Sequence, residues 1–232
     1  MNMNTLLGRQ ERLTYLSSSF SKLLKKSFGK GPKMCYTTMD DRHVYVYIQH
    51  FLTPSEHVLR KSGDFGQLVT YRSIIMEDIL VQFKQEVKKV VGVEYDRCLF
   101  DWNYDQNVGL VMLVKSESNV SKRPPIQLME EPLQKKVTAI SMENHKVPKK
   151  MALSKVNASF YVLEMKGTLH PVERTLYKRG YLSILLESSY ELNQVYRSYW
   201  QDFEKIFKKQ MSEFFILWDY QEDACYMLFF LE

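Results

Sequence analysis

Two combinations of a glutamate and an arginine are the most specific polar features of the sequence. Glu56 is followed by Arg72, and Glu173 is followed by Arg197. In one interpretation each arginine binds an anion or a partner while the glutamate orients the arginine. One version of this interpretation is an enzyme that acts on a small anion in a cleft lined by Arg72. In the other the pairs are structural, because Glu56 stands three residues after Thr53 and can complete a capping box. The sequence leaves both interpretations open.

A run of lysines without acidic residues is the second candidate for contact with a ligand. It comprises Lys22, Lys25, Lys26, Lys30 and Lys33. A basic amphipathic helix can lie on acidic lipid headgroups or contact nucleic acid, but it can also be an ordinary solvated face whose lysines favour the helix C-terminus. The second half of the chain has a comparable set, Lys135, Lys136, Lys146, Lys149 and Lys150. The candidate contacts for a partner or an anion are Lys22, Lys25, Lys26, Lys30, Arg72 and Arg197.

Catalytic, metal and cofactor motifs are missing from the sequence. It contains no P-loop, no dinucleotide-binding glycine motif, no HExxH and no nucleophile elbow. His43 and His50 fall on one expected strand at an odd offset and therefore on opposite faces, so they do not predict a shared metal site with His57. The three cysteines are far apart and fit reduced thiols. We therefore predict no catalytic residue, no cofactor and no metal.

Four aromatic residues on expected strands allow a nucleic-acid hypothesis. Tyr45, Tyr47, Trp102 and Tyr104 could stack on bases, but strands accept tyrosine readily and the sequence has no RNP-like segment. Packing is the favoured interpretation. A nucleic-acid-binding regulator that uses the basic helix and these strands is the alternative function, with nucleic acid a less favoured partner than protein.

The composition is that of a globular protein. The 232 residues are 45% hydrophobic and 25% charged, with a net charge of +5, and this apolar share is too high for a disordered chain. The sequence has no apolar signal region at its start and no apolar run of membrane-spanning length. We expect a soluble, cytoplasmic protein, with a peripheral contact at the inner face of the membrane as an open alternative.

An internal duplication is the strongest feature of the organisation. The segment Leu52–Gly63 recurs as Leu169–Gly180, with a proline matched to a proline 117 residues later. Trp102 recurs as Trp218, and the triplet that contains Arg72 recurs as the triplet that contains Arg197. Matches in one order, with shifts that vary little, indicate two copies of one unit. We predict a first unit at 1–115, a polar linker with paired prolines at 116–132 and a second unit at 133–232.

The same order of elements is expected in both units. Leu13, Leu16 and Phe20 indicate an amphipathic helix that ends at Gly29. Strands are expected at 33–39, 43–51, 97–103 and 108–114, a short helix from Thr53, and a long helix that ends at Gly92. In the second unit the expected face of the long helix is Leu192, Tyr196, Tyr199, Phe203, Phe207, Met211 and Phe214. The predicted fold class is α+β, with two diverged repeats of α-β-β-α-α-β-β whose helices pack on an antiparallel sheet.

The first unit resembles the MpsC-like family of bacteria, named after a component of a Na+-translocating membrane-potential-generating system. The resemblance covers roughly residues 10–114 and rests on Gly29-Lys-Gly-Pro32, Leu52-Thr-Pro-Ser-Glu56, Arg72, Gly92 and Asp101. The second unit departs from it, because His145-Lys-Val-Pro148 replaces the glycine motif and His170 replaces the threonine before proline. The residues that we assign to structural motifs are Gly29, Gly31, Pro32, Thr53, Pro54, Glu56, Pro171 and Glu173.

The resemblance implies an accessory protein. We expect a non-enzymatic, cytoplasmic binding protein whose partners are subunits of a membrane transport system for sodium or inorganic carbon. We also expect the two units to pack with pseudo-twofold symmetry, as a homodimer of single-unit relatives would.

Overall fold

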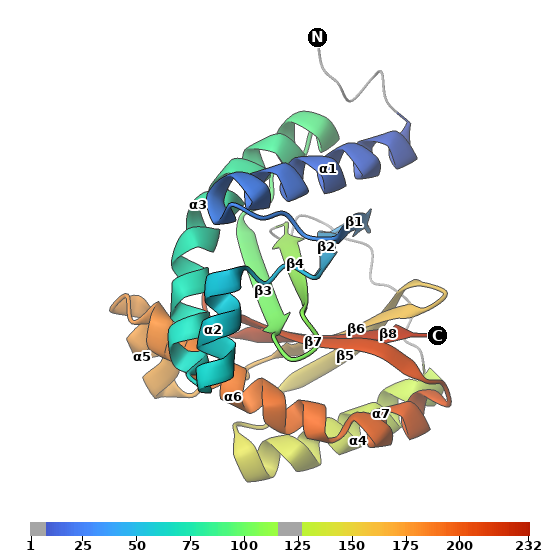
Figure 1. Cartoon of the computed structure of the whole chain (residues 1–232). Helices are drawn as coiled ribbons and strands as arrows, with labels where there is room; N and C mark the ends of the chain where they lie inside the picture. Colours follow the sequence, from blue (N-terminus) through green and yellow to red (C-terminus); the bar gives the residue numbers. More distant parts are fainter. Residues whose placement is uncertain (1–7, 116–126) are drawn as a thin grey trace. The chain divides into compact units, whose positions relative to one another are not determined.

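The chain divides into two compact units, residues 1–120 and 121–232. The computed structural model describes residues 8–115 and 127–232, and Figure 1 shows both units. Each unit contains one four-stranded antiparallel sheet together with helices. The α+β class with two similar units is confirmed. The packing of the units as a pseudo-dimer stays a prediction.

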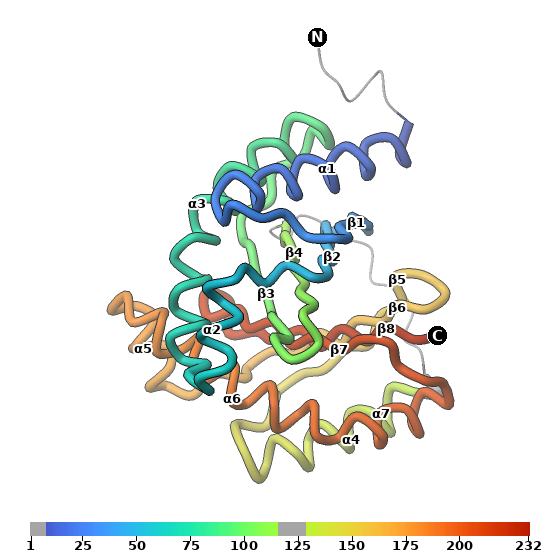
Figure 2. Tube along the Cα trace, viewed as in Figure 1, coloured from blue at the N-terminus to red at the C-terminus, as the bar shows by residue number. Residues whose placement is uncertain are grey.

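The first unit has the predicted order of elements. Its helices and strands are α1 (Arg9–Phe28), β1 (Met34–Met39), β2 (His43–Gln49), α2 (Pro54–Ser62), α3 (Phe65–Val91), β3 (Arg97–Asn103) and β4 (Val108–Val114). The sheet order is β1-β2-β4-β3, which leaves β1 and β3 at the edges. Helix α1 contacts both α3 and β1, as Figure 2 also shows along the Cα trace.

Local sequence explains where these elements end. Gly29 follows α1 in the left-handed conformation with φ 74°, and Gly92 follows α3 with φ 76°; glycine adopts this conformation without a Cβ penalty. Asp40 forms the turn between β1 and β2, because its carboxylate accepts hydrogen bonds from the backbone N–H groups of Arg42 and His43 at 2.7 and 2.9 Å. The expected glycine stops are confirmed.

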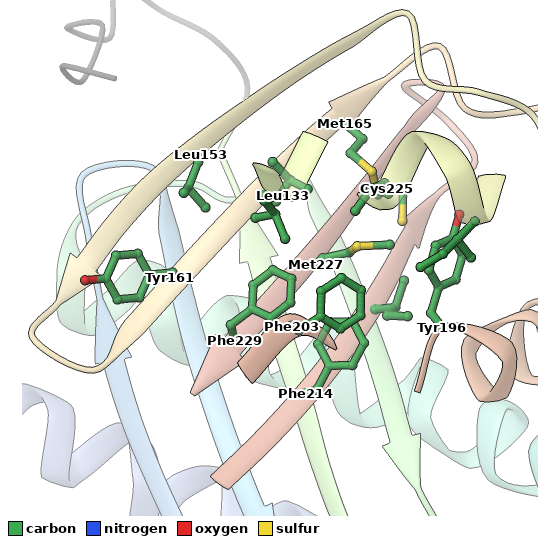
Figure 3. Packing of buried hydrophobic residues seen from close by; sticks show 14 of the residues in the cluster. Leu133, Leu153, Tyr161, Met165, Tyr196, Phe203, Phe214, Cys225, Met227 and Phe229 are labelled. Atoms are coloured by element: carbon green, nitrogen blue, oxygen red, sulfur yellow. The ribbon is translucent and has the colours of Figure 1, made fainter. Parts of the chain in front are cut away.

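The second unit repeats this plan with one additional helix. Its elements are α4 (Gln127–Asn144), β5 (Lys150–Asn157), β6 (Phe160–Lys166), α5 (Pro171–Lys178), α6 (Leu182–Ser198), α7 (Trp200–Phe207), β7 (Met211–Asp219) and β8 (Ala224–Leu231). The sheet order is β5-β6-β8-β7, so each sheet has the same connectivity. Rings of Phe203 in α7, Phe214 in β7 and Phe229 in β8 meet in the core at centroid distances of 4.8 to 5.4 Å, as Figure 3 shows.

The predicted long helix of the second unit is wrong in two respects. It is interrupted at Tyr199, and it ends at Phe207, so Met211 and Phe214 belong to strand β7. Spacing alone misassigned them, because a short apolar run does not distinguish a buried strand from a buried helix. The residue after α7 that adopts the left-handed conformation is Lys208, with φ 53°. Because it is not a glycine, the sequence carries no clear signal for the end of this helix.

The predicted linker is too long at its C-terminal end. Residues 127–132 belong to α4, and Pro132 lies inside this helix. The remaining linker residues, 116–126, lie outside the described part of the chain.

Candidate functional site

Glu56 and Arg72 form a buried ion pair in the first unit. The side chains are 0% and 1% exposed, and Arg72 Nη1 donates to Glu56 Oε1. Glu56 Oε2 accepts from the backbone N–H of Thr53 at 2.8 Å, and Thr53 Oγ1 accepts from the N–H of Glu56 at 3.3 Å. The predicted capping box is therefore present, and both carboxylate oxygens of Glu56 are occupied.

Three aromatic rings enclose the guanidinium of Arg72. Its Cζ lies 4.5 Å from the ring centroid of Phe28, 4.0 Å from that of Phe51 and 4.3 Å from that of Trp102. These contacts are within cation–π range. Burial lowers the pKa of Arg72, while the neighbouring Glu56 opposes that shift. The cluster joins the end of α1, the start of α2, the long helix α3 and strand β3.

This burial contradicts the hypothesis of an anion cleft lined by Arg72. A solute would have to displace Glu56 and the aromatic rings to reach the guanidinium. Breaking a buried pair leaves an uncompensated charge at a cost of roughly 3–5 kcal/mol. The pair instead connects α2 to α3, which is the structural interpretation.

The second unit has a different partner for its matching glutamate. His145 Nε2 lies 3.0 and 3.1 Å from the two carboxylate oxygens of Glu173, whose side chain is 17% exposed. The backbone N–H of His170 donates to Glu173 Oε2 at 2.6 Å. Burial alone would raise the pKa of Glu173, but the hydrogen bonds from His145 and His170 outweigh it, so this pKa is lowered.

The predicted equivalence of Arg197 with Arg72 is wrong. Arg72 is the eighth residue of α3, whereas Arg197 lies in the last turn of α6. Counted from the start of each helix, Ser189 takes the place of Arg72. The matching triplets misled the comparison because a three-residue match does not determine helix register. His145, which stands where the first unit has Gly29, supplies the partner of Glu173 instead.

The lysines of the first unit separate into two kinds. Lys30 Nζ donates to the backbone oxygen of Leu52 at 2.7 Å, and Lys146 makes the matching bond to Leu169 at 2.6 Å. Lys30 therefore has a structural contact that recurs in the second unit. By contrast, Lys22, Lys25 and Lys26 are exposed and make no side-chain hydrogen bond or ion pair within the described residues.

An open groove of about 510 Å³ lies between α1 and the edge strand β1. Lys22 and Lys33 line it, with no acidic residue among its walls. The other lining residues are Gln10, Leu13, Thr14, Ser17, Ser18, Ser21, Pro32, Cys35, Tyr36 and Thr37. A second, smaller groove of about 270 Å³ between α1 and α3 includes Lys22 and Lys26. The exposed lysines of α1 therefore border hollows of the surface, and this is the candidate contact site.

The described residues do not support a reactive cysteine, a metal site or a base-stacking surface. Burial raises the pKa of both Cys35 and Cys98 to about 12, which disfavours the reactive thiolate. Residues 8–115 and 127–232 contain no group of three histidine, cysteine or acidic side chains arranged to hold a metal. Tyr45, Tyr47, Trp102 and Tyr104 are buried, which contradicts a base-stacking surface on these strands.

Sequence reasoning missed a turn residue that recurs in both units. Asn107 Oδ1 accepts from the N–H groups of Phe51 and Leu52 at 2.9 and 3.0 Å. Asp223 Oδ1 accepts from the N–H of Leu169 at 2.7 Å. Both turn residues have positive φ, at 57° and 50°. Both residues stand immediately before the last strand of their unit. This position was an available but weak signal, because asparagine and aspartate tolerate positive φ.

Comparison with known proteins agrees with the resemblance of the first unit. Residues 9–116 match the family model described as the Na+-translocating membrane potential-generating system (MpsC). A second copy of that family in residues 133–232 stays a prediction. No curated protein and no solved structure matches the chain. None of the helices in the described part has the length and apolar character needed to cross a bilayer.

Proposed function

We propose that this protein is a non-enzymatic accessory component that binds a subunit of a Na+-translocating or inorganic-carbon transport system through the exposed lysines of α1. The observation that supports this proposal is the family match over residues 9–116. The lysine surface adds a means of contact, since Lys22, Lys25 and Lys26 are charged, exposed and without an ion pair among the described residues.

The contact is electrostatic in character. Unpaired surface lysines attract an acidic surface over a Debye length of about 8 Å at physiological salt. A protein partner with an acidic face fits this surface, and the same charges allow a peripheral contact with the inner face of the membrane. The buried Arg72 has no part in this contact, and a contact through Arg197 stays a prediction.

Affinity purification of the full chain from its native cells tests the proposal. We expect mass spectrometry to identify a subunit of a membrane transport system with the wild-type protein, and at least a fivefold smaller yield with the variant Lys22→Glu/Lys26→Glu. The matched control is Lys61→Glu/Lys178→Glu, which makes the same change of charge at exposed positions in the last turns of α2 and α5. Equal recovery with both variants, or no transport subunit with the wild type, would contradict the proposal.

Binding of nucleic acid is the competing outcome. A complex that depends on the α1 lysines but contains DNA or RNA would lose affinity steeply with salt, by about one log unit per log unit of salt for each phosphate contacted. That result would replace the proposed function with that of a nucleic-acid-binding regulator.

A further inference from the structure

We infer that the groove between α1 and β1 binds an extended acidic segment of a partner protein, which adds to the sheet as a fifth strand beside β1. The inference deepens the proposed function and rests on it for the identity of the partner, but its physical basis lies in the first unit alone. It joins three observations: an edge strand with available backbone groups, a groove of matching length and unpaired lysines along its walls.

The register of the sheet determines which backbone groups of β1 face outward. Asp40 N–H donates to His43 O at the hairpin turn, and hydrogen-bonded pairs recur at every second residue of an antiparallel ladder. The residues of β1 that bond to β2 are therefore the even-numbered ones, and the peptide groups of Cys35, Thr37 and Met39 face outward. Arg9 Nη2 donates to Met39 O at 2.9 Å, which agrees with this direction.

In the second unit, side chains of the helix cover the matching edge strand. Its edge strand β5 has Met151 and Leu153 at the positions of Cys35 and Thr37, counted 116 residues along the chain. Gln134 Nε2 in α4 donates to Met151 O at 3.3 Å, and Glu130 Oε1 accepts from the N–H of Leu153 at 3.1 Å. Two long polar side chains of the helix thus satisfy two backbone groups of the edge strand, the Met151 carbonyl and the Leu153 N–H.

The first unit has short side chains at both of these helix positions. Thr14 and Ser18 stand where the second unit has Glu130 and Gln134, and Thr14 Oγ1 donates to its own helix at Gln10 O. Thr14 and Ser18 instead line the groove of about 510 Å³. The groove therefore occupies the space that helix side chains fill in the second unit.

The dimensions of the groove fit an extended peptide. Its lining residues extend from Gln10 to Lys22 along α1, which is roughly 18 Å at the rise of a helix. They extend from Pro32 to Thr37 along the strand, which is roughly 17 Å. A strand of about six residues has this length, and strand addition is a known mode of peptide recognition.

The side chains around the edge indicate the sequence of the segment. Ser17 Oγ donates to Thr37 Oγ1 at 3.0 Å, so Thr37 faces α1. Lys33, just before β1, lines the same groove. On the side of β1 opposite to Thr37, Met34 is 50% and Tyr36 is 40% exposed. A bound strand therefore places alternate residues near Lys22 and Lys33 and the others near Met34 and Tyr36. The ligand that fits is a segment in which acidic and apolar residues alternate.

The test uses the full chain and a fluorescent, acetylated and amidated ten-residue peptide in which glutamate alternates with valine or threonine. The variant Thr14→Glu/Ser18→Gln transfers the closing side chains of the second unit to the first, and we expect it to bind the peptide at least tenfold more weakly than the wild type. The matched control Thr14→Ala/Ser18→Ala leaves the groove open and keeps the affinity within about twofold. In the wild-type complex, the amide hydrogens of Cys35 and Thr37 exchange more slowly.

Two further probes separate strand addition from charge attraction. A peptide that is N-methylated at alternate residues keeps its charge but loses the N–H donors, and we expect it to bind at least tenfold more weakly. Vesicles that contain phosphatidylglycerol test a lipid surface instead.

Each contrary result overturns the inference. Examples are no binding of the parent peptide at millimolar concentration, equal binding by the N-methylated peptide, equal binding by the closing variant, and vesicle binding in place of peptide binding. If the peptide fails while affinity purification still recovers a transport subunit through the α1 lysines, strand addition is wrong and the proposed function stands. If the peptide binds and no transport subunit is recovered, the groove is a peptide site and the transport setting is wrong.

Discussion

The two units build the same junction between helix and sheet from different side chains. In the first, Glu56 is paired with Arg72 from the long helix, and in the second, Glu173 is paired with His145. Both glutamates accept a hydrogen bond from the backbone of the residue before a proline. The glutamate and its bond to the backbone are therefore the constant part of this junction, and the side chain that pairs with the glutamate differs between the units.

The two units also differ at one edge strand of the sheet, which is β1 in the first unit and β5 in the second. The second unit satisfies its edge strand with Glu130 and Gln134, while the first leaves a groove at the matching place. An uncovered edge attracts other strands, and proteins usually block it. This difference between the two copies is the basis for the inference that the open edge of the first unit binds a strand.

Among the substitutions that test the difference between the units, removal of the Arg72 side chain should reduce stability the most. Arg72→Ala leaves Glu56 buried without its cation, and we expect the free energy of unfolding of the first unit to fall by about 3–5 kcal/mol. Urea unfolding, with hydrogen exchange to assign the loss to residues 8–115, measures this. Lys61→Ala, an exposed control in α2, should change it by less than about 0.5 kcal/mol. A loss below about 1 kcal/mol for Arg72→Ala would show that the pair is not structural.

A glycine in β4 gives the next largest effect. A Cβ at Gly109 would lie 2.2 Å from Cε3 of Trp102, so Gly109→Ala must displace the ring that covers Arg72. We expect a loss of about 1–3 kcal/mol, as for overpacking in other cores. At the matching position the second unit has the buried Cys225, and Cys225→Ala should cost no more than about 1 kcal/mol. Thermal unfolding compares the two variants, and an equal cost for both would contradict the proposed packing difference.

The smallest expected effect is a pH dependence in the second unit. The pKa of Glu173 is lowered in the folded state, so this group contributes stability above its ordinary pKa of 4.5, and that contribution is lost as the pH falls through the folded pKa. We expect unfolding of residues 127–232 to become easier below about pH 4.5. In Glu173→Gln this part of the pH dependence should disappear, as measured by urea unfolding between pH 3 and 6. An unchanged slope in that variant would mean that other carboxylates are responsible.

The local features of the fold were readable from the residues themselves. The capping box at Thr53 and Glu56 and the glycine ends of two helices were predicted correctly, because each depends on backbone groups within a few residues. The strands at 97–103 and 108–114 were also predicted correctly, because their residue types favour strands. The break at Tyr199 and the strand at Met211 were missed, since tertiary packing overrides an ambiguous apolar spacing.

The candidate site was predicted only in part. The exposure of Lys22, Lys25 and Lys26 agrees with the basic face that the sequence indicates. Lys30 was grouped with them, although its ammonium bonds to the backbone of Leu52. Its partner stands 22 residues away, and no local pattern distinguishes a lysine that bends back to its own chain from one that reaches into solvent.

The sequence by itself determined that the chain contains two similar units, because the repeated segments can be recognised by their residues. It also determined which glutamates lie in the first turns of the short helices, because a capping box depends on residues only three positions apart. Only the tertiary structure decided that Arg72 is enclosed by rings from α1, β3 and the segment before α2, and that His145 replaces it in the second unit. It also decided that one sheet edge is closed and the other is open. The physical reason is that these contacts join residues far apart in the chain, and their geometry depends on how helices and strands pack.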